Sequence, residues 1–567
     1  MSTLDWVVLF WTLISIVAFG VYKTRGKKNL DAYLRGKNSM NWWTIGLSIM
    51  ATQASAITFL STPGQAYEDG MRFIQFYFGL PLAMIIISVS FIPIYYKLKV
   101  YTAYEYLEGR FDLKTRTLTA LLFIVQRGLG AGITIYAPAI ILSTLLGWNL
   151  TFTNVLIGVL VIVYTVSGGT EAVSITQKQQ MAVMMGGMIL AGIIVIQLLP
   201  ISFQEALHVA GKMDKLNVVS FEFDLSDRYN IWSGMTAAVF LFLSYFGTDQ
   251  SQVQRYLSGQ TLTQSRMGLI MNGFLKIPMQ FLILFIGVMV FVFYQFTQPP
   301  VVFNKVQTEK LQQSPYASDY SKLEEDYSRS FQEGKMAYQA MLEAVEGEDD
   351  LKIAAFRERI KEIKSEQSEI RDEVKSLILQ NDPTAETRDT DYVFMRFVMD
   401  YLPQGLVGLL FAVIFSAAMS SSASELNALG STSTIDLYKR SLKKEASDQH
   451  YLFSSKIFTA FWGLGAILFA TYASLFENLI QAVNLLGSLF YGTILGIFLV
   501  GFFMKWIKGK AVFLAALFSQ ALILVIHFWN GIGLFGMYWD IGFLWYNAIG
   551  CLAVMGVGAF LQLILKK

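Results

Sequence analysis

The sequence predicts an all-α polytopic membrane protein, and three observations carry that prediction. Of the 567 residues, 54% are hydrophobic and 14% aromatic, and the mean hydropathy is +0.46. About thirteen apolar stretches reach the roughly 20 residues that a helix needs to cross a hydrocarbon core. Lys and Arg are concentrated in connections between these stretches. Helices are expected because lipid offers backbone groups no hydrogen-bond partners.

The spans follow one another along nearly the whole chain. We expect them near 4–22, 41–66, 73–97, 117–147, 152–169, 179–200, 231–254, 268–297, 392–438, 452–473, 476–504, 510–529 and 540–564. The first begins at Asp5 without a basic region before it or a small-residue cleavage site after it. It is therefore expected to be a retained helix and not a signal peptide.

The basic connections set an orientation. They contain Lys23, Arg25, Lys27 and Lys28; Lys97, Lys99, Arg110, Lys114 and Arg116; Lys439, Arg440, Lys443 and Lys444; residues 505–510; and Lys566 with Lys567. With thirteen spans all of these groups fall on one side, which the positive-inside rule makes cytoplasmic. The sequence thus predicts a multi-pass protein of the plasma (cytoplasmic) membrane, surrounded by lipid, with its N-terminus outside and its C-terminus inside.

Residues 303–390 interrupt the apolar pattern. From 320 to 380 the chain is dense in Glu and Lys at helical spacing, which predicts a pair of amphipathic helices. A long loop is translocated largely regardless of its charge, so these lysines agree with an outer location. Two interpretations stay open: an elaborated extracellular cap, or a module that docks an extracellular partner.

One predicted span is crowded with small hydroxyl side chains. It reads FSAAMSSSASELNALGSTSTID over 415–436, and its helical period places Ala417, Ser420, Ser421 and Ser424 on one face. Small residues allow close packing of membrane helices. The same face could instead offer oxygen ligands to a hard cation.

The second span, SIMATQASAITFLSTPGQAY over 48–67, mixes apolar residues with hydroxyl and amide groups and contains Pro63-Gly64. Discontinuous helices whose free carbonyls coordinate Na⁺ are typical of secondary transporters. Carbonyls from this helix and hydroxyls of Ser420 and Ser421 would form a neutral cage. Such a cage suits Na⁺ better than Ca²⁺, for which carboxylates would be expected.

Ionisable residues within spans are costly and indicate function by default. Arg127 could face a substrate cavity, and Lys276 could either do so or extend to the cytoplasmic interface. Asp249 and Arg255 are expected to pair with each other, and Glu425 with a nearby basic group. The lone Cys551 is expected to be a packed thiol. The sequence contains no phosphate-binding loop, Cys/His metal cluster or catalytic triad pattern, so neither enzymatic chemistry nor nucleic-acid binding is predicted.

Five stretches together resemble the sodium/solute symporter family, which includes sodium/glucose, proline, sialic acid and iodide symporters. They are TAYEYLEGRF (102–111), TVSGGTEAVSITQ (165–177), QSQVQRYLS (250–258), SSSASELNALGSTSTIDLYKR (420–440) and LGIFLVGFFMKWIKGKA (495–511). The resemblance covers most of 1–300 and 390–511. ATQASAITFLSTPGQAYEDG and GITIYAPAIIL look most like the iodide, multivitamin and monocarboxylate branch, whereas FLKIPMQFLILF looks like sugar transporters.

The resemblance implies a LeuT-type fold of two inverted five-helix repeats. A leading helix and basic loop (1–40) would precede the first repeat (41–200), and an extracellular loop (201–230) would separate it from the second (231–504). The second repeat would be interrupted by 303–390 and followed by two C-terminal helices (505–567).

The resemblance also implies binding residues. The sodium site would use carbonyls of Ala51, Ala54 and Ala417 with hydroxyls of Ser420 and Ser421. Some members hold a second sodium with an Asp and two serines, where this chain has Gln177, Ala423 and Ser424, so one Na⁺ per cycle is expected. The substrate cavity would be lined by Gln53, Ile57, Thr58, Gln75, Phe76, Arg127, Tyr245, Phe246, Lys276 and Asn484.

These expectations define a Na⁺-coupled symporter that moves a small organic solute by alternating access. Arg127 favours an organic anion such as sialic acid or a monocarboxylate, because sialic acid members carry an Arg at this place. The alternative is a neutral sugar or polyol, favoured by Lys276. A sodium channel or leak is a further alternative, and a solute receptor would normally need a cytoplasmic signalling domain.

Overall fold

The structure is a computed structural model that describes residues 1–24, 40–227, 229–383, 385, 387, 389–472, 479–529 and 540–565. Within these ranges the chain is helical and has no strand; a single isolated bridge joins Met40 and Gly259. Among the expected basic residues, the side chain of Lys23 and all of Arg25, Lys27, Lys28, Lys566 and Lys567 lie outside the described part.

The N-terminal third supplies the first part of the membrane core. Its elements are α1 (Thr3–Thr24), α3 (Trp42–Gln53), α4 (Ala56–Asp69), η2 (Gly70–Tyr77), α5 (Leu80–Ile86), η3 (Ile87–Phe91), α6 (Ile92–Leu98), α7 (Glu105–Arg110), α8 (Leu113–Leu146) and α9 (Leu150–Gln197). The span expected at 152–169 and all but the last three residues of the span expected at 179–200 fall within the single element α9.

The remaining core elements come from both sides of the polar insert. They are α10 (Phe203–Lys212), η4 (Ser233–Ala237), α11 (Ala238–Gly247), α12 (Gln250–Leu257), α13 (Leu262–Phe296), α17 (Thr390–Tyr401), α18 (Leu406–Thr432), η5 (Ser433–Leu442), α19 (Asp448–Ala470), α20 (Leu479–Phe503), α21 (Gly509–Trp529) and α22 (Trp545–Leu565). In the described ranges, 9 helices are long and apolar enough to cross a membrane. The helical fold class is confirmed, while the number thirteen stays a prediction.

The span expected at 392–438 is wrong as a single helix. The chain leaves α17 at Leu402 and enters α18 at Leu406, and Gly405 between them has φ +88°. A backbone with this positive φ favours glycine, since it has no Cβ. Because the residues on both sides of Pro403 are apolar, the hydropathy pattern does not reveal this break.

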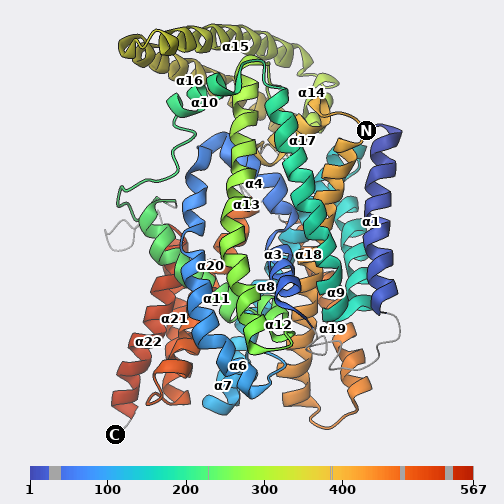
Figure 1. The fold of residues 1–567 in the computed structure, drawn as a ribbon, viewed down its shortest axis with the longest axis vertical. Helices are drawn as coiled ribbons and strands as arrows, with labels where there is room; N and C mark the ends of the chain where they lie inside the picture. Colours follow the sequence, from blue (N-terminus) through green and yellow to red (C-terminus); the bar gives the residue numbers. More distant parts are fainter. Residues whose placement is uncertain are drawn as a thin grey trace.

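The polar insert forms the pair of long helices that its charge pattern predicts. α14 (Lys305–Gln312) leads into α15 (Ala317–Glu346) and α16 (Asp350–Asn381), which pack against each other. Figure 1 shows this pair, called the hairpin below, lying across one end of the helical core, next to the N-terminus and at the opposite end from the C-terminus.

The core helices pack around α18, which has all but a few of its side chains buried. Its neighbours include α9, α1, α8 and α19. Many large apolar side chains point outward instead, among them Trp11, Val89, Phe461, Leu468 and Phe560, each more than half exposed. An apolar exterior around a buried polar centre is expected of a protein whose solvent is lipid.

Candidate functional site

The helix of the second span is broken at Ala54 and Ser55, and not at Pro63-Gly64. α3 ends at Gln53 and α4 begins at Ala56, while the backbone of Ser55 is extended (φ −78°, ψ 172°). Such an end leaves the last carbonyls of α3 without intrahelical partners. Pro63 and Gly64 continue α4, where Gly64 allows the backbone of α17 to approach closely.

The hydroxyl face of α18 meets this break. Ser420 Oγ donates to the Ala51 carbonyl at 2.9 Å, and Ser421 Oγ donates to the Ala417 carbonyl at 2.8 Å. These residues and Ala54 are buried, with exposed fractions of 0 or 1%. The structure therefore brings together two helices that are more than 350 residues apart in the chain, and it does so through oxygen atoms.

Gln177 from α9 extends its amide into the same hydroxyl groups. Its Nε2 donates to Ser420 Oγ and Ser424 Oγ, both at 2.9 Å, and to Thr52 Oγ1 at 3.0 Å. Its Oε1 accepts a hydrogen bond from Ser48. The amide nitrogen thus presents hydrogen to oxygens that would otherwise be free to face a cation. The neighbouring Ala423 is buried and brings no side-chain oxygen.

The oxygen groups at the break fit a monovalent hard cation. They are carbonyls and hydroxyls, and the described residues contain no group of three or more His, Cys, Asp or Glu that could hold a metal ion. Na⁺ prefers oxygen ligands of this kind, and a site for Ca²⁺ would be expected to include carboxylates.

Arg127 lies beside this region in a buried cluster of charges. It pairs with Asp249 and, at 3.1 Å, with Glu425, and it donates to Tyr491 Oη at 2.7 Å. Its guanidinium also stacks over the ring of Tyr245, 5.3 Å from the centroid. The Arg127 guanidinium thus faces two carboxylates. The attraction between these opposite charges offsets the free-energy cost of burying each of them alone.

These contacts revise one expected pair and confirm another. Asp249 takes Arg127 as its ionic partner and not Arg255. Arg255 is buried and donates to Ser174 Oγ at 3.2 Å and to the Thr170 carbonyl at 3.4 Å. Glu425 does pair with a basic group, as expected. Helix spacing gave no means of choosing Arg127, which lies 122 residues away from Asp249.

A small cavity joins the two sets of residues. Its volume is about 80 Å³, well below the roughly 300–1,000 Å³ that small-molecule sites typically span. Seven of the ten predicted substrate residues line it: Gln53, Ile57, Thr58, Phe76, Arg127, Tyr245 and Asn484. Ser421 lines it as well, so the proposed ion ligands and the cavity share a wall. The helices around this central cavity therefore have to separate before it reaches the size typical of a small-molecule site.

The other three predicted substrate residues lie elsewhere. Gln75 donates to the Tyr229 carbonyl at 2.8 Å and accepts from Ser220 N at 2.9 Å, so it holds the loop after α10. Phe246 packs on Tyr245. Lys276 neither lines the cavity nor extends to an interface: it is fully buried, with Nζ 5.8 Å from the centroid of the Tyr77 ring.

Several lining residues were missed by sequence reasoning. They include Tyr77, Thr134, Leu241, Phe242, Val483 and Tyr491. Apart from Thr134 they are aromatic or aliphatic residues, which are common throughout the spans, so no signal singled them out. Glu425, which also lines the cavity, carried a signal as an ionisable residue within a span, although it was interpreted as structural.

The lone cysteine behaves as predicted. Cys551 is a free thiol with an exposed fraction of 0%, packed on α22. It lies far along the chain from every residue of the cavity and takes no part in it.

A helical membrane core that contains a discontinuous helix beside a buried polar cavity defines the class of secondary transporters. The model of the sodium:solute symporter family matches residues 33–317 and 379–518 of this chain. The chain therefore belongs to the sodium:solute symporter family, as the five sequence stretches indicate, and Na⁺ is its predicted coupling ion.

Individual relatives cover the chain to different extents. The sodium/sialic acid symporter SiaT of Proteus mirabilis is 26% identical over 566 residues, 98% of this chain and 94% of the relative. The sodium-coupled monocarboxylate transporter 1 of Xenopus laevis is 34% identical over 275 residues, 47% of this chain and 43% of the relative. The solved structure of a Na⁺-coupled sialic acid symporter superposes with a TM-score of 0.75 at 24% identity, covering 99% of this chain and 98% of the other. That likeness establishes the fold.

Proposed function

We propose that this protein is a Na⁺-coupled symporter of a small organic anion, such as a sialic acid or another monocarboxylate. The observation that carries the proposal is the shared wall of the central cavity. Ser421 belongs both to the hydroxyl face and to the cavity lining, and Arg127 lines the same cavity. Full-length relatives that carry the name of sodium/sialic acid symporters support this substrate class.

The proposed sodium site consists of the carbonyls of Ala51, Ala54 and Ala417 and the hydroxyls of Ser420 and Ser421. Ser420 and Ala51 already lie within hydrogen-bond distance, so a bound Na⁺ would hold α18 against the break in α3. A second sodium at Gln177, Ala423 and Ser424 is disfavoured, because Ala423 brings no side-chain oxygen and the Gln177 amide donates a hydrogen bond to Ser424 Oγ. We therefore propose one Na⁺ per cycle.

Alternating access follows from the same contacts. Na⁺ binding would stabilise one arrangement of α3, α4 and α18 and complete the cavity for the solute. A ligand shifts such an equilibrium only through its different affinities for the two states. The inverted repeats at 41–200 and 231–504 would supply the two halves that move relative to each other.

A neutral sugar or polyol is a second candidate, and one observation favours it. The charge of Arg127 is already matched by Asp249 and Glu425, so an incoming carboxylate has to compete with Glu425 for the guanidinium. Lys276 does not itself line the cavity, although its Nζ lies 5.8 Å from the centroid of the Tyr77 ring, which does. A sodium leak stays a third candidate, which uptake against a gradient would exclude.

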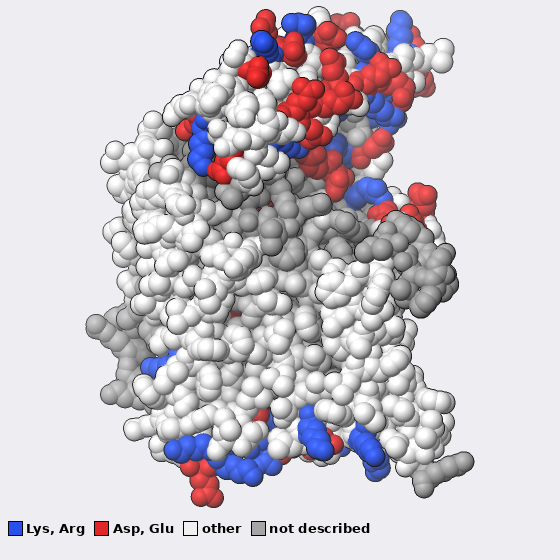
Figure 2. All heavy atoms as spheres, turned by 180° about the vertical axis from the view of Figure 1, so that it is seen from behind, with Lys and Arg blue, Asp and Glu red and all other residues white. Residues whose placement is uncertain are grey.

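We further propose a plasma-membrane location with the hairpin outside. Figure 2 shows a broad, largely uncharged band, with mainly Lys and Arg at the end of the molecule opposite the hairpin and both signs over the hairpin. Cytoplasmic faces carry the excess of Lys and Arg. The uncharged band would contact membrane lipid.

The test is a thermal-stability screen of the purified protein. Sialic acids, short monocarboxylates, neutral sugars and iodide would each be added in Na⁺ and in K⁺. A ligand at 100 times its Kd stabilises the folded state by about 2.7 kcal/mol. A shift that one carboxylate produces only in Na⁺ supports the proposal. A shift with neutral sugars alone would favour the second candidate, and shifts independent of Na⁺ would contradict coupling.

A further inference from the structure

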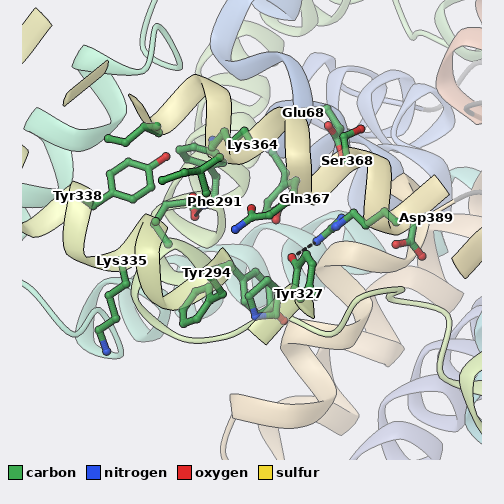
Figure 3. A pocket seen from close by; sticks show the side chains of 18 of the residues that line it. Glu68, Phe291, Tyr294, Tyr327, Lys335, Tyr338, Lys364, Gln367, Ser368 and Asp389 are labelled. Atoms are coloured by element: carbon green, nitrogen blue, oxygen red, sulfur yellow. Dashed lines mark hydrogen bonds between the residues drawn. The ribbon is translucent and has the colours of Figure 1, made fainter. Parts of the chain in front are cut away.

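A cavity larger than the central one lies outside the membrane core, beneath the hairpin. Its volume is about 620 Å³, which falls within the 300–1,000 Å³ that small-molecule sites typically span. It is bounded by the ends of α4 and α13 on one side and by α15 and α16 on the other. Figure 3 shows side chains from these elements directed into the space between them. Residues 318–378, all of the hairpin except its two ends, lie outside the two regions that the family model matches.

Positive charge dominates the lining of this cavity, called the hairpin cavity below. Five basic side chains contribute to it: Lys215, Lys335, Lys364, Arg371 and Lys375. Only two carboxylates do so, Glu68 and Asp389. The Asp389 carboxylate already accepts hydrogen bonds from the backbone of Phe303, at 2.8 and 2.9 Å, and Glu68 is exposed. Lys375 pairs at 2.8 Å with Asp372, which lies outside the lining, so the other four cations are set against two carboxylates within the cavity.

Lys364 contributes an ammonium group that lies against the aromatic wall of the hairpin cavity. Its ammonium lies over the Phe291 ring at 4.0 Å from the centroid and 5.9 Å from that of Tyr338. Within the described part of the chain no carboxylate forms an ion pair with it, whereas the outward-facing Lys361 on the same helix pairs with Glu358 at 2.7 Å. Burial, with Lys215 close by, lowers the pKa of Lys364 well below its ordinary value. An anion placed here would relieve that cost.

Hydrogen-bond donors also face this cavity without partners. The hydroxyls of Tyr294 and Tyr338 are buried and lack a hydrogen-bond partner among the described residues, although a buried polar group is normally paired. Both side chains are 2% exposed. Figure 3 shows the Tyr338 hydroxyl turned toward Lys364 and the Gln367 amide extending into the space. Unpaired donors beside an ammonium group suit an acceptor with negative charge.

The aromatic walls narrow the class of ligand. Tyr67, Phe291, Tyr327 and Tyr338 give the cavity flat apolar surfaces, which bind rings or aliphatic bodies. Aromatic walls also bind organic cations. Here, however, the ammonium groups of Lys215, at 4.8 Å from the ring centroid, and of Lys364 already lie over the Phe291 ring. A cationic ligand would meet these like charges.

We propose that the hairpin cavity is a second ligand site, which binds a small organic carboxylate with a ring or apolar body. The site is separate from the central cavity and does not require Na⁺. Its occupant has two possible sources: the transported solute on its way to the central cavity, or a different anion that remains outside. The proposal stands independently of the transported substrate, because the ligand is recognised by residues of the hairpin.

The test is equilibrium binding to the full-length protein in lipid nanodiscs, in K⁺ without Na⁺. N-acetylneuraminate and indole-3-acetate serve as carboxylate probes, with N-acetylmannosamine and indole-3-acetamide as their neutral counterparts. We expect at least one carboxylate to bind and its counterpart to bind at least tenfold more weakly. Lys364→Met should weaken binding at least tenfold and Lys364→Arg should largely preserve it. Lys361→Met, the same change on the outer face of α16, should leave it unaltered.

The outcomes separate the possibilities. Absence of carboxylate binding, equal binding of the neutral counterparts, or identical affinities of the Lys364→Met and Lys361→Met variants would overturn the proposal. Uptake into proteoliposomes then distinguishes the sources. A bound carboxylate that is also taken up, with a raised KM in Lys364→Met, would be solute captured on its path. One that binds and is not taken up would be a separate anion. If a carboxylate binds to the hairpin cavity as expected but no Na⁺-coupled uptake is measured, the proposed transport function would be contradicted. The proposed hairpin site would not be.

Discussion

Ser421 is the residue at which the proposed ion and solute sites meet. Its hydroxyl donates to the Ala417 carbonyl and its side chain lines the central cavity. A hydrogen bond or ligand contact to a charged partner contributes about 1.5–3 kcal/mol. We expect Ser421→Ala to raise the Na⁺ concentration for half-maximal uptake about tenfold or more. Ser422→Ala is the matched control, since Ser422 is buried on the same helix and does not line the cavity. Equal Na⁺ responses of the two variants would contradict the site.

Gln177 provides a test of the number of sodium ions. Its amide donates to Ser420, Ser424 and Thr52. The double change Gln177→Asp with Ala423→Ser would replace a hydrogen-bond donor by a carboxylate and add an oxygen. A buried carboxylate without a partner is costly, so we expect Na⁺ to raise the melting temperature more than in the parent and the Hill coefficient to move from about 1 toward about 2. An unchanged Hill coefficient, together with an unchanged effect of Na⁺ on the melting temperature, would refute the expectation that these two changes create a second sodium site.

Arg127 has two roles that one variant would disturb together. Arg127→Ala should abolish carboxylate binding, and it should also lower the free energy of unfolding by about 3–5 kcal/mol, because Asp249 and Glu425 lose their shared partner. Glu425→Gln separates the roles, since it keeps Arg127 and removes the competing charge. We expect that variant to bind a carboxylate more tightly than the parent. Unchanged carboxylate affinity in both variants would assign Arg127 to packing alone.

Sequence reasoning located the site better than it assigned partners. The hydroxyl pattern of α18 and the polar second span identified the two helices that meet at Ser420 and Ala51. The resemblance to sugar transporters placed Lys276 in the substrate cavity, but Lys276 does not line the cavity and its ammonium faces Tyr77. The helical period predicts which residues share a face, and it does not predict which neighbour that face meets. The pairing of Asp249 with Arg127 depends on that neighbour.

At the scale of elements, the start of α1 stabilises the start of α18. The Asp5 carboxylate accepts hydrogen bonds from the backbone of Gly405 at 2.6 Å and Gly408 at 3.2 Å. It thus acts as an N-terminal cap supplied by another helix, where free amides need acceptors. Gly408 permits the contact, since a Cβ there would lie 2.1 Å from the Asp5 carbonyl oxygen.

This cap predicts a measurable loss of stability. Asp5→Ala should lower the free energy of unfolding by about 1 kcal/mol, the usual cost of losing a capping acceptor. Asp5→Asn keeps one acceptor oxygen and should cost less. The measurement is unfolding of the purified protein in a denaturing detergent series. If Asp5→Ala matches the parent, the contact does not stabilise α18.

The elements themselves were predictable where periodicity and composition agreed. The charged spacing of 320–380 led to α15 and α16. The cavity beneath them was not predicted, because it also needs Tyr67 from α4 and Phe291 from α13. The break at Gly405 was missed because hydropathy averages over a window longer than the four residues of the turn. Composition thus predicts a helix more readily than its ends.

At the scale of the whole molecule, its two ends differ in charge and in structure. Figure 1 places the hairpin and the N-terminus at one end and the C-terminus at the other. A solute would therefore meet the hairpin cavity before it reaches the central cavity, if the hairpin is outside. The charge of that solute determines how strongly the protein can accumulate it.

The last prediction concerns charge movement. One Na⁺ entering down a tenfold gradient releases about 1.4 kcal/mol, and its charge releases about 2.3 kcal/mol more across 100 mV. With a neutral solute the total of roughly 3.7 kcal/mol supports accumulation of about 500-fold. A monoanion cancels the transported charge, so only about tenfold accumulation remains.

The proposed anion symporter should therefore be electrically silent. In proteoliposomes with a tenfold Na⁺ gradient, an inside-negative K⁺ diffusion potential should leave the steady-state accumulation of the anion unchanged. A neutral solute taken up with one Na⁺ would instead accumulate about fiftyfold more when 100 mV is imposed. A potential-dependent accumulation of a monoanion would require more than one Na⁺ per cycle. Because the Gln177 amide donates to Ser424 Oγ, the side-chain oxygen left at the second site, that result would overturn the assignment of Gln177 before that of Ser421.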